Sequence, residues 1–411
     1  MRLTVSLLVV ATLCCLTTAL FASDWPQFRG PNADGISPET GVNTDWTVRA
    51  PAQLWQTELS DNGYAGPAVA DGKVFIIDHH GSQDVVRALD LNNGKEIWHF
   101  AYDDSSEDNF GFARSTPAIS ENCVYTLSKL GTVMCLNTKT GEKVWSRNII
   151  KDFAGKLPQW ELAMSPLVDG DRVILCPGGE NAAVVALNKY SGATLWQGGG
   201  SDLPGYATPV AATFDGVRQY VVLTAARLLG IEADNGKVLW SYPWQTGSDV
   251  NAATPVIIGN AVFLTSSYHH GCALLEIAGG KPLLRWQNVE MQSQFSTPIY
   301  YNGYLYGTTD YPYGHLVCLD SKTGSAMWKW PGFEKGAGIA VSGLLMMGVG
   351  DSGEYVLINM TPVGYMELGR FLPLGGRSWT APVLAERKLL VRNKKVLACL
   401  WTFALCHLVS C

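Results

Sequence analysis

Three short stretches of this sequence carry side chains that could bind a metal ion. Residues 103–111, DDSSEDNFG, space oxygen ligands at alternate positions as a calcium loop does. They lack the glycine at the sixth position and the final glutamate of such a loop, so a solvated loop is the better interpretation and calcium is the alternative. The pairs His79–His80 and His269–His270 could hold a transition metal, but loop histidines are more often exposed. We therefore expect no metal site.

Motifs for other chemistry are weak or missing. Residues 348–353, GVGDSG, match the pattern GxGxxG, but they lie between predicted strands and no helix follows them, which argues against a dinucleotide site. The sequence contains no GxSxG, HExxH or protein-kinase signature. The eight cysteines after residue 22 are widely spaced without a CxxC pair, which argues against a disulfide scaffold. We predict no catalytic residues.

A second group of residues combines aromatic rings with positive charges just ahead of predicted strands. Most of these residues precede the opening proline of a strand by three positions. Aromatic faces beside Arg and Lys could bind a flat or anionic ligand or a peptide strand, whereas the alternative is that they pair with one another and fill a channel. The candidate ligand-binding residues are Tyr64, Arg114, Glu161, Tyr206, Asn251, Phe295, Lys335, Arg377 and Trp379.

The elements that would position these residues come from a repeat that ends in tryptophan. ALDLNNGKEIW at 88–98 returns as CLNTKTGEKVW at 135–145 and CLDSKTGSAMW at 318–328. Successive tryptophans from 98 to 328 are 42 to 51 residues apart, which suits a propeller blade of about 40–50 residues. Within a period, short strands alternate with Asp-Gly and Asn-Gly type turns, so we predict four antiparallel strands per blade.

The tryptophan of each repeat is expected to join one blade to the next. Its large ring would be buried against the neighbouring blade, and its N–H would donate to a backbone oxygen. The residues predicted to dock blades in this way are Trp55, Trp98, Trp145, Trp196, Trp240, Trp286 and Trp328.

Counting the residues that open the first strand of each blade gives eight blades. Seven are prolines, and Gly338 fills the remaining gap. The last copy supplies only three strands, whereas Gln53–Leu59 is an isolated strand that carries Trp55. We therefore predict an all-β, eight-bladed β-propeller of four-stranded antiparallel blades, with the ring closed by this N-terminal strand so that no sheet edge is left open.

These repeats resemble the pyrroloquinoline quinone (PQQ)-like propeller superfamily, which includes quinoprotein alcohol dehydrogenases and the BamB lipoprotein of outer-membrane protein assembly. DWPQFRGPN at 24–32 and WELAMSPLV at 160–168 resemble exported PQQ-like repeat proteins of bacterial envelopes. The resemblance implies that the aromatic and basic residues line one mouth of a central channel. The quinoproteins hold PQQ between a tryptophan and a disulfide of adjacent cysteines, beside Ca²⁺ and an aspartate base. This chain has no adjacent cysteines after residue 22.

The chain divides into four segments on this interpretation. Residues 1–22, with Arg2 before an apolar run, read as a signal peptide, so we expect a periplasmic or secreted protein. Residues 23–52 are an anchoring segment, in which we expect Trp25 and Phe28 to be buried and Arg29 to be paired. Residues 53–400 form one propeller, and residues 401–411 are an atypical apolar tail too short to span a bilayer.

The predicted function is that of a non-catalytic binding or scaffold protein, similar to BamB, which holds an envelope protein partner. The net charge of −6 does not favour nucleic acid as a partner, and no transmembrane segment is expected. No cofactor is expected, with PQQ and calcium as alternatives. The first alternative function is a PQQ-dependent dehydrogenase. The second is a receptor that binds a carbohydrate or a peptide at the channel mouth. A small anionic ligand is also possible there.

Overall fold

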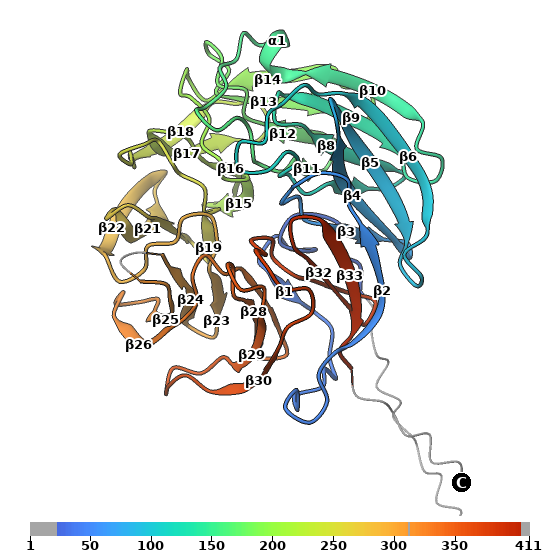
Figure 1. The fold of residues 1–411 in the computed structure, drawn as a ribbon. Helices are drawn as coiled ribbons and strands as arrows, with labels where there is room; N and C mark the ends of the chain where they lie inside the picture. The colour runs from blue at the N-terminus through green and yellow to red at the C-terminus, as the bar shows by residue number, and fades with distance from the viewer. Residues whose placement is uncertain (1–22, 311–312, 404–411) are drawn as a thin grey trace, which may run out of the picture.

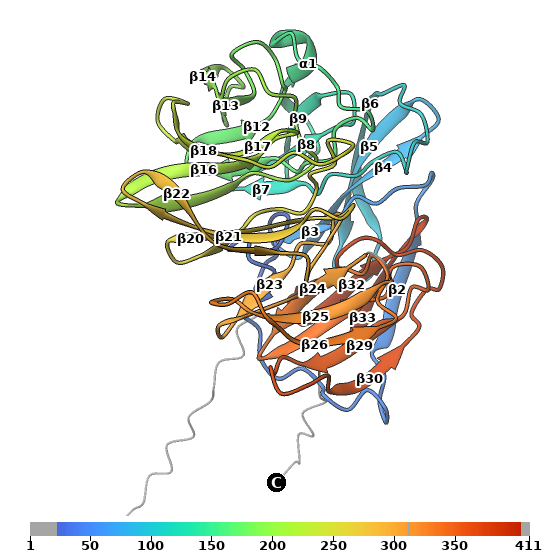
Figure 2. The same ribbon diagram turned by 90° about the vertical axis from the view of Figure 1, so that its left-hand side faces the viewer.

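The structure is a computed structural model that describes residues 23–310 and 313–403. Eight four-stranded sheets follow one another around a central axis, and each sheet is one blade. Figure 1 looks down this axis, and Figure 2 shows the same ring from the side. The predicted all-β, eight-bladed propeller is confirmed.

Each blade meanders outward from the axis, so its first strand lies innermost and its fourth lies at the rim. Strand β1 (Ile36–Ser37) joins the seventh blade by parallel pairing with β27, and the short helix α1 (Ile149–Asp152) follows the second blade. The blades, in chain order, are β3 (Ala68–Ala70), β4 (Lys73–His80), β5 (Gln83–Asp90), β6 (Glu96–Asp103); β7 (Ala118–Ser120), β8 (Cys123–Leu127), β9 (Thr132–Asn137), β10 (Lys143–Asn148); β11 (Leu167–Asp169), β12 (Arg172–Leu175), β13 (Val184–Asn188), β14 (Thr194–Gly198); β15 (Val210–Phe214), β16 (Val217–Leu223), β17 (Arg227–Glu232), β18 (Val238–Pro243); β19 (Val256–Ile258), β20 (Ala261–Ser266), β21 (Gly271–Ala278), β22 (Lys281–Asn288); β23 (Ile299–Tyr301), β24 (Tyr304–Thr309), β25 (His315–Asp320), β26 (Ala326–Pro331); β27 (Gly338–Val341), β28 (Leu344–Gly348), β29 (Tyr355–Asn359), β30 (Glu367–Phe371); and β31 (Val383–Ala385), β32 (Lys388–Arg392), β33 (Val396–Trp401) with β2 (Ala52–Glu58).

The ring closes where the two ends of the propeller meet. Strand β2 pairs antiparallel with β33, with Trp55 opposite Cys399, so the predicted closing strand is confirmed. Strand β33 runs to Trp401, one residue beyond the expected end of the propeller at 400. Trp401 therefore belongs to the last blade and not to a tail, because it pairs with both Ala52 and Lys388. Residues 404–411 lie outside the described residues.

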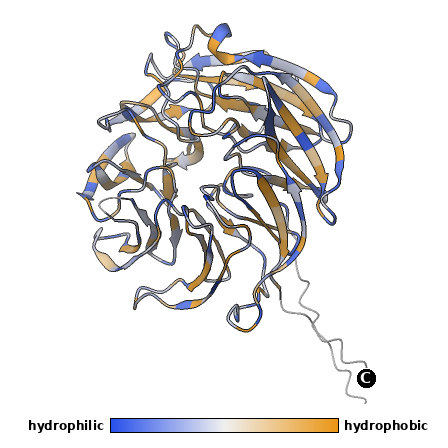
Figure 3. Cartoon of the chain, viewed as in Figure 1, coloured by the Kyte–Doolittle hydropathy of each residue, from blue (hydrophilic) through white to orange (hydrophobic). Residues whose placement is uncertain are grey.

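The middle strands of the blades bury most of their side chains, because each blade packs face to face against two neighbours. Strand β20 is buried along its whole length, whereas the rim strand β26 is not buried at any position. Figure 3 shows apolar residues gathered on the strands, with polar residues prominent in the connecting loops. None of the helical segments in the described part of the chain has the length and apolar character needed to cross a bilayer.

Six of the seven repeat tryptophans donate their indole N–H to a backbone oxygen of the next blade. The acceptors lie at the turn that follows the third strand, which explains why the turn and the tryptophan recur together in the sequence. The donor–acceptor pairs are Trp55 to Leu91 at 2.9 Å, Trp98 to Thr138 at 3.1 Å, Trp145 to Lys189 at 2.8 Å, Trp196 to Ala233 at 2.9 Å, Trp286 to Ser321 at 3.0 Å and Trp328 to Thr361 at 2.9 Å.

Trp240 departs from this pattern, which corrects the prediction that its N–H donates to a backbone oxygen. Its indole N–H donates to the side chain of Gln219 in its own blade, at 2.8 Å. The ring lies over Gly230, which is opposite Trp240 on the adjacent strand, and a Cβ at Gly230 would come within 2.0 Å of the indole. Glycine therefore leaves room for the ring at the position where most other repeats have Ala or Cys.

The space around the turn glycines shows how closely adjacent blades are packed. Gly236 has φ +77°, and a Cβ there would lie 2.5 Å from the Trp196 ring of the preceding blade. Gly280 occupies the matching turn of the fifth blade with φ +69°, and nothing lies within 4 Å of its Cβ position, because Trp240 has turned away. The turn at Gly236 therefore has no space for a methyl group, whereas the turn at Gly280 does.

We expect Gly236→Ala to lower the free energy of unfolding by about 2–3 kcal/mol and Gly280→Ala by about 1 kcal/mol. Both substitutions force alanine into the left-handed region, but only the first displaces an indole. Urea unfolding of the two variants measures the difference. Equal losses would show that contact between this turn and the preceding tryptophan does not limit the packing of the blades.

The N-terminal segment lies across the other end of the ring, opposite the loops that lead into the first strands. Trp25 is buried and exchanges backbone hydrogen bonds with Val69 of the first blade. Further along, the buried carboxylate of Glu39 accepts the N–H of Arg387, which lies in the β31–β32 turn of the last blade, at 3.0 and 3.1 Å. Segment 23–39 thus ties together blades that are far apart in the sequence.

Candidate functional site

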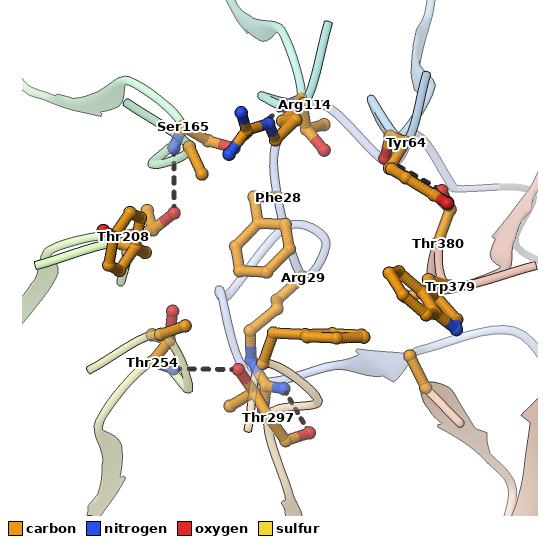
Figure 4. Close-up of a pocket in the computed structure, with 18 of the residues that line it drawn as sticks. Phe28, Arg29, Tyr64, Arg114, Ser165, Thr208, Thr254, Thr297, Trp379 and Thr380 are labelled. Atoms are coloured by element: carbon orange, nitrogen blue, oxygen red, sulfur yellow. Dashed lines mark hydrogen bonds between the residues drawn. The ribbon is translucent and has the colours of Figure 1, made fainter. Parts of the chain in front are cut away.

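A pocket of about 280 Å³ lies at the centre of the ring. Its wall comes from residues at the start of each blade, and Trp25, Phe28, Arg29 and Gly35 of the N-terminal segment contribute its floor. Figure 4 shows Phe28 and Arg29 in the middle of a circle of wall residues drawn from different blades. Because the N-terminal segment covers the opposite end, the pocket is entered from the end that carries the loops between blades.

Six of the nine predicted ligand-binding residues line this pocket. Because the blades of a propeller are arranged around one axis, the residues three positions before the proline or glycine that opens each blade meet at one end of the ring. The lining residues among those predicted are Tyr64, Arg114, Tyr206, Phe295, Lys335 and Trp379. Glu161, Asn251 and Arg377 do not line it.

Asn251 is placed where a ligand cannot reach it. Its side chain is fully buried, and the amide N–H groups donate to the carbonyl oxygens of Thr224 and Trp244, both at 2.9 Å. Its side-chain oxygen accepts the hydroxyl of Ser266 at 2.9 Å. With donors and acceptor both satisfied, Asn251 holds the loop between the fourth and fifth blades and does not face the pocket.

Glu161 and Arg114 form part of a charge cluster beside the pocket, in which Arg114 lines the cavity and Glu161 lies behind it. The carboxylate of Glu161 accepts Arg114 at 3.0 Å and lies 3.5 Å from the ammonium group of Lys129. Burial lowers the pKa of Arg114 and of Lys129, and the repulsion between the two cations lowers that of Lys129 further. One carboxylate therefore serves two cations, which leaves the cluster with a net positive charge.

Trp379 is the centre of a second cluster at the mouth. Tyr64 stacks on it with ring centroids 5.1 Å apart, and Phe295 lies at 5.3 Å. The ammonium of Lys335 lies 4.9 Å, and the guanidinium carbon of Arg377 4.4 Å, from the centre of the Trp379 ring. Arg377 is exposed and pairs with Asp351 at 3.2 Å, so it supports Trp379 from outside the pocket. We name these five residues, Tyr64, Phe295, Lys335, Arg377 and Trp379, the Trp379 cluster.

Several further residues line the pocket that the sequence pattern did not predict. Phe110, Trp160 and Tyr268 reach it from loops that do not follow the three-before-proline rule. A circle of hydroxyl residues lies deeper, in most cases directly before the proline that opens a first strand. This circle consists of Thr116, Ser165, Thr208, Thr254, Thr297 and Thr380. A signal was present, because Ser or Thr precedes that proline in five blades.

Backbone-to-hydroxyl bonds connect this circle from blade to blade. The N–H of Thr116 donates to the Ser165 hydroxyl and the N–H of Ser165 to the Thr208 hydroxyl, each at 2.9 Å. The N–H of Thr254 donates in the same way to the hydroxyl of Thr297, at 3.0 Å. Figure 4 shows the second and third of these bonds. They fix the width of the pocket, because each bond joins the first strands of two adjacent blades.

Arg29 forms the floor together with Phe28. Its guanidinium is buried and donates to four backbone oxygens, those of Ala33, Asp34, Thr297 and Pro298, at 2.7 to 3.2 Å. Burial lowers the pKa of Arg29 to about 10, so it is still a cation at neutral pH. Phe28 is only half buried, which corrects the expectation of a buried ring, because it faces the pocket.

The residues around the pocket do not fit the quinone and calcium that the PQQ-like resemblance implies. No Asp or Glu is among the described residues that line it, so carboxylate ligands for Ca²⁺ and a carboxylate base are lacking there. The described cysteines are free, and none lines the pocket. Across residues 23–310 and 313–403, no group of three or more His, Cys, Asp or Glu side chains could hold a metal ion.

Most of the acidic stretch is the expected solvated loop, with Ser105, Glu107 and Asp108 exposed, whereas the first histidine pair lies differently from the expectation. Asp103 ends strand β6, and Asp104 is buried. His79 is also buried, with its Nδ1 2.9 Å from an Asp84 carboxylate oxygen and its Nε2 3.0 Å from the carbonyl oxygen of Gly81. Both partners accept hydrogen bonds when Asp84 is ionised, so the protonated form of His79, in which both ring nitrogens donate, satisfies both contacts. The ring also stacks on Phe112, with centroids 4.1 Å apart.

His79 makes part of the stability pH-dependent. Burial alone would lower its pKa, but the hydrogen bonds to Asp84 and Gly81 and the charges of Asp84 and Asp104 raise it above the usual value. Because the folded pKa is the higher one, the stabilisation is complete below the unfolded pKa of about 6.5 and is lost as the pH rises through the folded pKa.

We expect His79→Gln to lower the free energy of unfolding by about 2 kcal/mol near pH 5.5 and by less near pH 9, measured by urea unfolding at both pH values. His80→Gln is the matched control, because His80 is exposed at the end of the same strand. A loss for His79→Gln that is the same at both pH values would contradict the charged state of this histidine.

Comparisons with known proteins agree with the fold and its repeats. The family model described as outer membrane protein assembly factor BamB matches residues 82–330. The tetrathionate hydrolase of Acidithiobacillus ferrooxidans is 26% identical over 245 residues, which cover 54% of this chain and 45% of that protein. The BamB of Salmonella typhimurium is 28% identical over 144 residues, covering 34% of this chain and 32% of that protein. The chain thus spans less than half the length of these two relatives.

Other relatives match over more of their length. The BamB of Escherichia coli is 27% identical over 344 residues, covering 69% of this chain and 82% of that protein. Among solved structures, BamB from Moraxella catarrhalis has a TM-score of 0.64 at 16% identity, covering 85% of this chain and 97% of that one. The quinohemoprotein alcohol dehydrogenase of Comamonas testosteroni has a TM-score of 0.67 at 14% identity, covering 92% and 80%. At these identities the structural likeness shows the fold alone.

Proposed function

This chain belongs to the PQQ-like repeat family whose model is described as outer membrane protein assembly factor BamB, and we propose that it is a non-catalytic β-propeller that binds another protein in the cell envelope. The family match is the observation that carries the proposal, because it spans more than half of the chain. Residues 1–22, interpreted as a signal peptide, lie outside the described residues, and a periplasmic or secreted location is therefore part of the proposal.

The chemistry of the central pocket supports a binding role. Its described lining residues include no Asp, Glu, His or Cys, the side chains that most often act as acids, bases or nucleophiles. They are instead rich in Trp and Tyr and include Arg, which are the residues that dominate binding energy at protein interfaces.

Cross-linking in intact cells tests the scaffold role. The tagged full-length protein would be cross-linked, captured under denaturing conditions and its partners identified by mass spectrometry, with an unrelated tagged envelope protein as the control. We expect a small, reproducible set of envelope proteins that the control does not retain. Recovery of the same proteins with both baits would contradict a dedicated scaffold function.

An enzyme is the second candidate, because the fold is shared with a quinohemoprotein alcohol dehydrogenase. The test is to incubate the purified protein with PQQ and Ca²⁺, and to follow the absorption of bound quinone and the reduction of a dye by added alcohols. We expect neither, because the pocket offers no carboxylate for Ca²⁺ among its described residues. Bound quinone together with dye reduction would contradict the non-catalytic proposal.

A further inference from the structure

The pocket has an unbalanced charge. Three cations, Arg29, Arg114 and Lys335, line it, and the described lining residues include no carboxylate. Arg114 shares its carboxylate partner with Lys129. Arg29 donates only to backbone oxygens. The ammonium of Lys335 makes no ion pair within the described residues, but the buried carboxylate of Asp310 behind the wall accepts the Lys335 backbone N–H and is attracted by the Lys335 charge. A cavity with net positive charge and low-dielectric walls attracts an anion.

Most of the described polar side chains in the wall can donate hydrogen bonds, in addition to the three that carry a positive charge. The hydroxyls of Ser165, Thr208 and Thr297 accept backbone N–H groups from neighbouring blades, so their own protons remain to be donated. A neutral sugar presents hydroxyl groups that need acceptors, and among the described lining side chains Asp, Glu and Asn are lacking, so Gln294 supplies the one amide or carboxylate acceptor there. A carboxylate only accepts, and it therefore fits these walls better than a sugar does.

The rim of the pocket carries aromatic rings that a ligand confined to the cavity would leave uncovered. Phe110 is 57% exposed and Tyr268 is 48% exposed, and both line the entrance. Trp379 lies at the same mouth, held between Tyr64 and Phe295. Fixed aromatic side chains of this kind, surrounding a pocket, are typical anchors of protein interfaces. A peptide that enters the pocket from a larger partner would cover them.

We propose that the mouth of the central pocket binds an acidic peptide segment of the partner protein, with a carboxylate held by Lys335 and an aromatic or apolar side chain packed on Trp379 and Phe28. The charge of the wall selects acidic over basic segments. The floor formed by the N-terminal segment limits entry to a loop or chain end. This inference rests on the proposed function, since it identifies the kind of partner that the scaffold holds.

Fluorescence anisotropy with labelled synthetic peptides tests the proposal. One peptide carries two aspartates between phenylalanines, a second has asparagines in their place, and a third has lysines. We expect the acidic peptide to bind at least about tenfold more tightly than the asparagine peptide, with no measurable binding of the lysine peptide. Equal affinities for the three, or no binding of the acidic peptide at millimolar concentration, would overturn the proposal.

Variants of the full-length protein locate the binding. Lys335→Gln and Trp379→Ala should each weaken binding of the acidic peptide by about tenfold. Lys237→Gln is the matched control, because Lys237 is an exposed lysine in the β17–β18 turn, at the opposite end of the ring. Melting temperatures of all variants show whether folding is retained. Unchanged affinity in folded Lys335→Gln, or an equal loss in the control, would contradict the assignment.

Two further experiments complete the test. The first distinguishes a peptide carboxylate from a small free acid, and the second distinguishes failure of this inference from failure of the scaffold function. Phenylacetate represents a small free acid, and we expect it to compete only weakly, because it cannot reach the rim aromatics. Competition as strong as that of the unlabelled acidic peptide would assign the pocket to a small acid instead. In the cross-linking experiment, loss of the partner from Trp379→Ala supports the inference. Full retention contradicts the inference and leaves the scaffold function standing.

Discussion

Replacing Trp145 by alanine should lower the free energy of unfolding by about 3–5 kcal/mol, the usual range for removing a large buried aromatic ring. The side chain is only 8% exposed, and it packs at the interface between the second and third blades. Its N–H donates to Lys189 of the next blade at 2.8 Å, and its ring lies where a Cβ on Gly192 would come within 2.8 Å. Alanine leaves a cavity and removes one of the two hydrogen bonds to the Lys189 carbonyl oxygen, which still accepts the Tyr125 hydroxyl at 3.1 Å.

Two controls separate the contact between blades from the general effect of losing an indole. Trp330→Ala removes a tryptophan that is 45% exposed on the rim strand β26, and we expect a loss below about 1 kcal/mol. Trp145→Phe keeps most of the buried ring but loses the hydrogen bond, and should cost an intermediate amount. Urea unfolding measures all three variants. Similar losses for Trp145→Ala and Trp330→Ala would contradict the role of the repeat tryptophan in joining the blades.

The fold could be predicted from the sequence because each repeat contains both halves of a contact between blades. The turn of one repeat supplies the carbonyl acceptor and the close-packed glycine, and the last strand supplies the tryptophan that reaches the next blade. Gly192 and Trp145 are such a pair, and Gly324 and Trp286 are another. Because the contact is the same at most blade junctions, reading the pattern once predicts the ring.

The exception at Trp240 arose from a detail that the repeat alignment passed over. Gly230 lies where most other repeats have Ala or Cys, and glycine differs from both in leaving room for an indole of the same blade. The acceptor, Gln219, lies on the adjacent strand β16 and belongs to no recurring motif. The acceptor that an indole N–H binds depends on the space around the ring in the folded protein. A repeat pattern in the sequence does not contain this information.

The candidate site was only partly predictable. The prediction used one position in each blade, three residues before the proline or glycine that opens the first strand. That rule located Tyr64, Phe295, Lys335 and Trp379 at the pocket. It could not distinguish Asn251, whose amide turns into the protein to bind backbone oxygens. Trp160 and Tyr268 come from loops of irregular length, and Phe28 comes from outside the repeats, so no periodic signal places them.

Replacing Arg29 by alanine should lower the free energy of unfolding by about 3 kcal/mol, because backbone oxygens buried beside it would lose their donor. Thr297 and Pro298 belong to the start of the sixth blade, whereas Ala33 and Asp34 belong to the N-terminal segment, so the guanidinium joins the segment to the ring. Arg29→Lys should also destabilise, since a single ammonium group cannot reach four oxygens in these directions. Arg377→Lys is the control, because Arg377 is exposed, and it should cost less than about 0.5 kcal/mol. Urea unfolding measures each loss, and limited proteolysis near residue 29 reports release of the segment. A folded Arg29→Ala protein with wild-type stability and an equally protected N-terminal segment would refute the view that this buried cation holds the floor of the pocket in place.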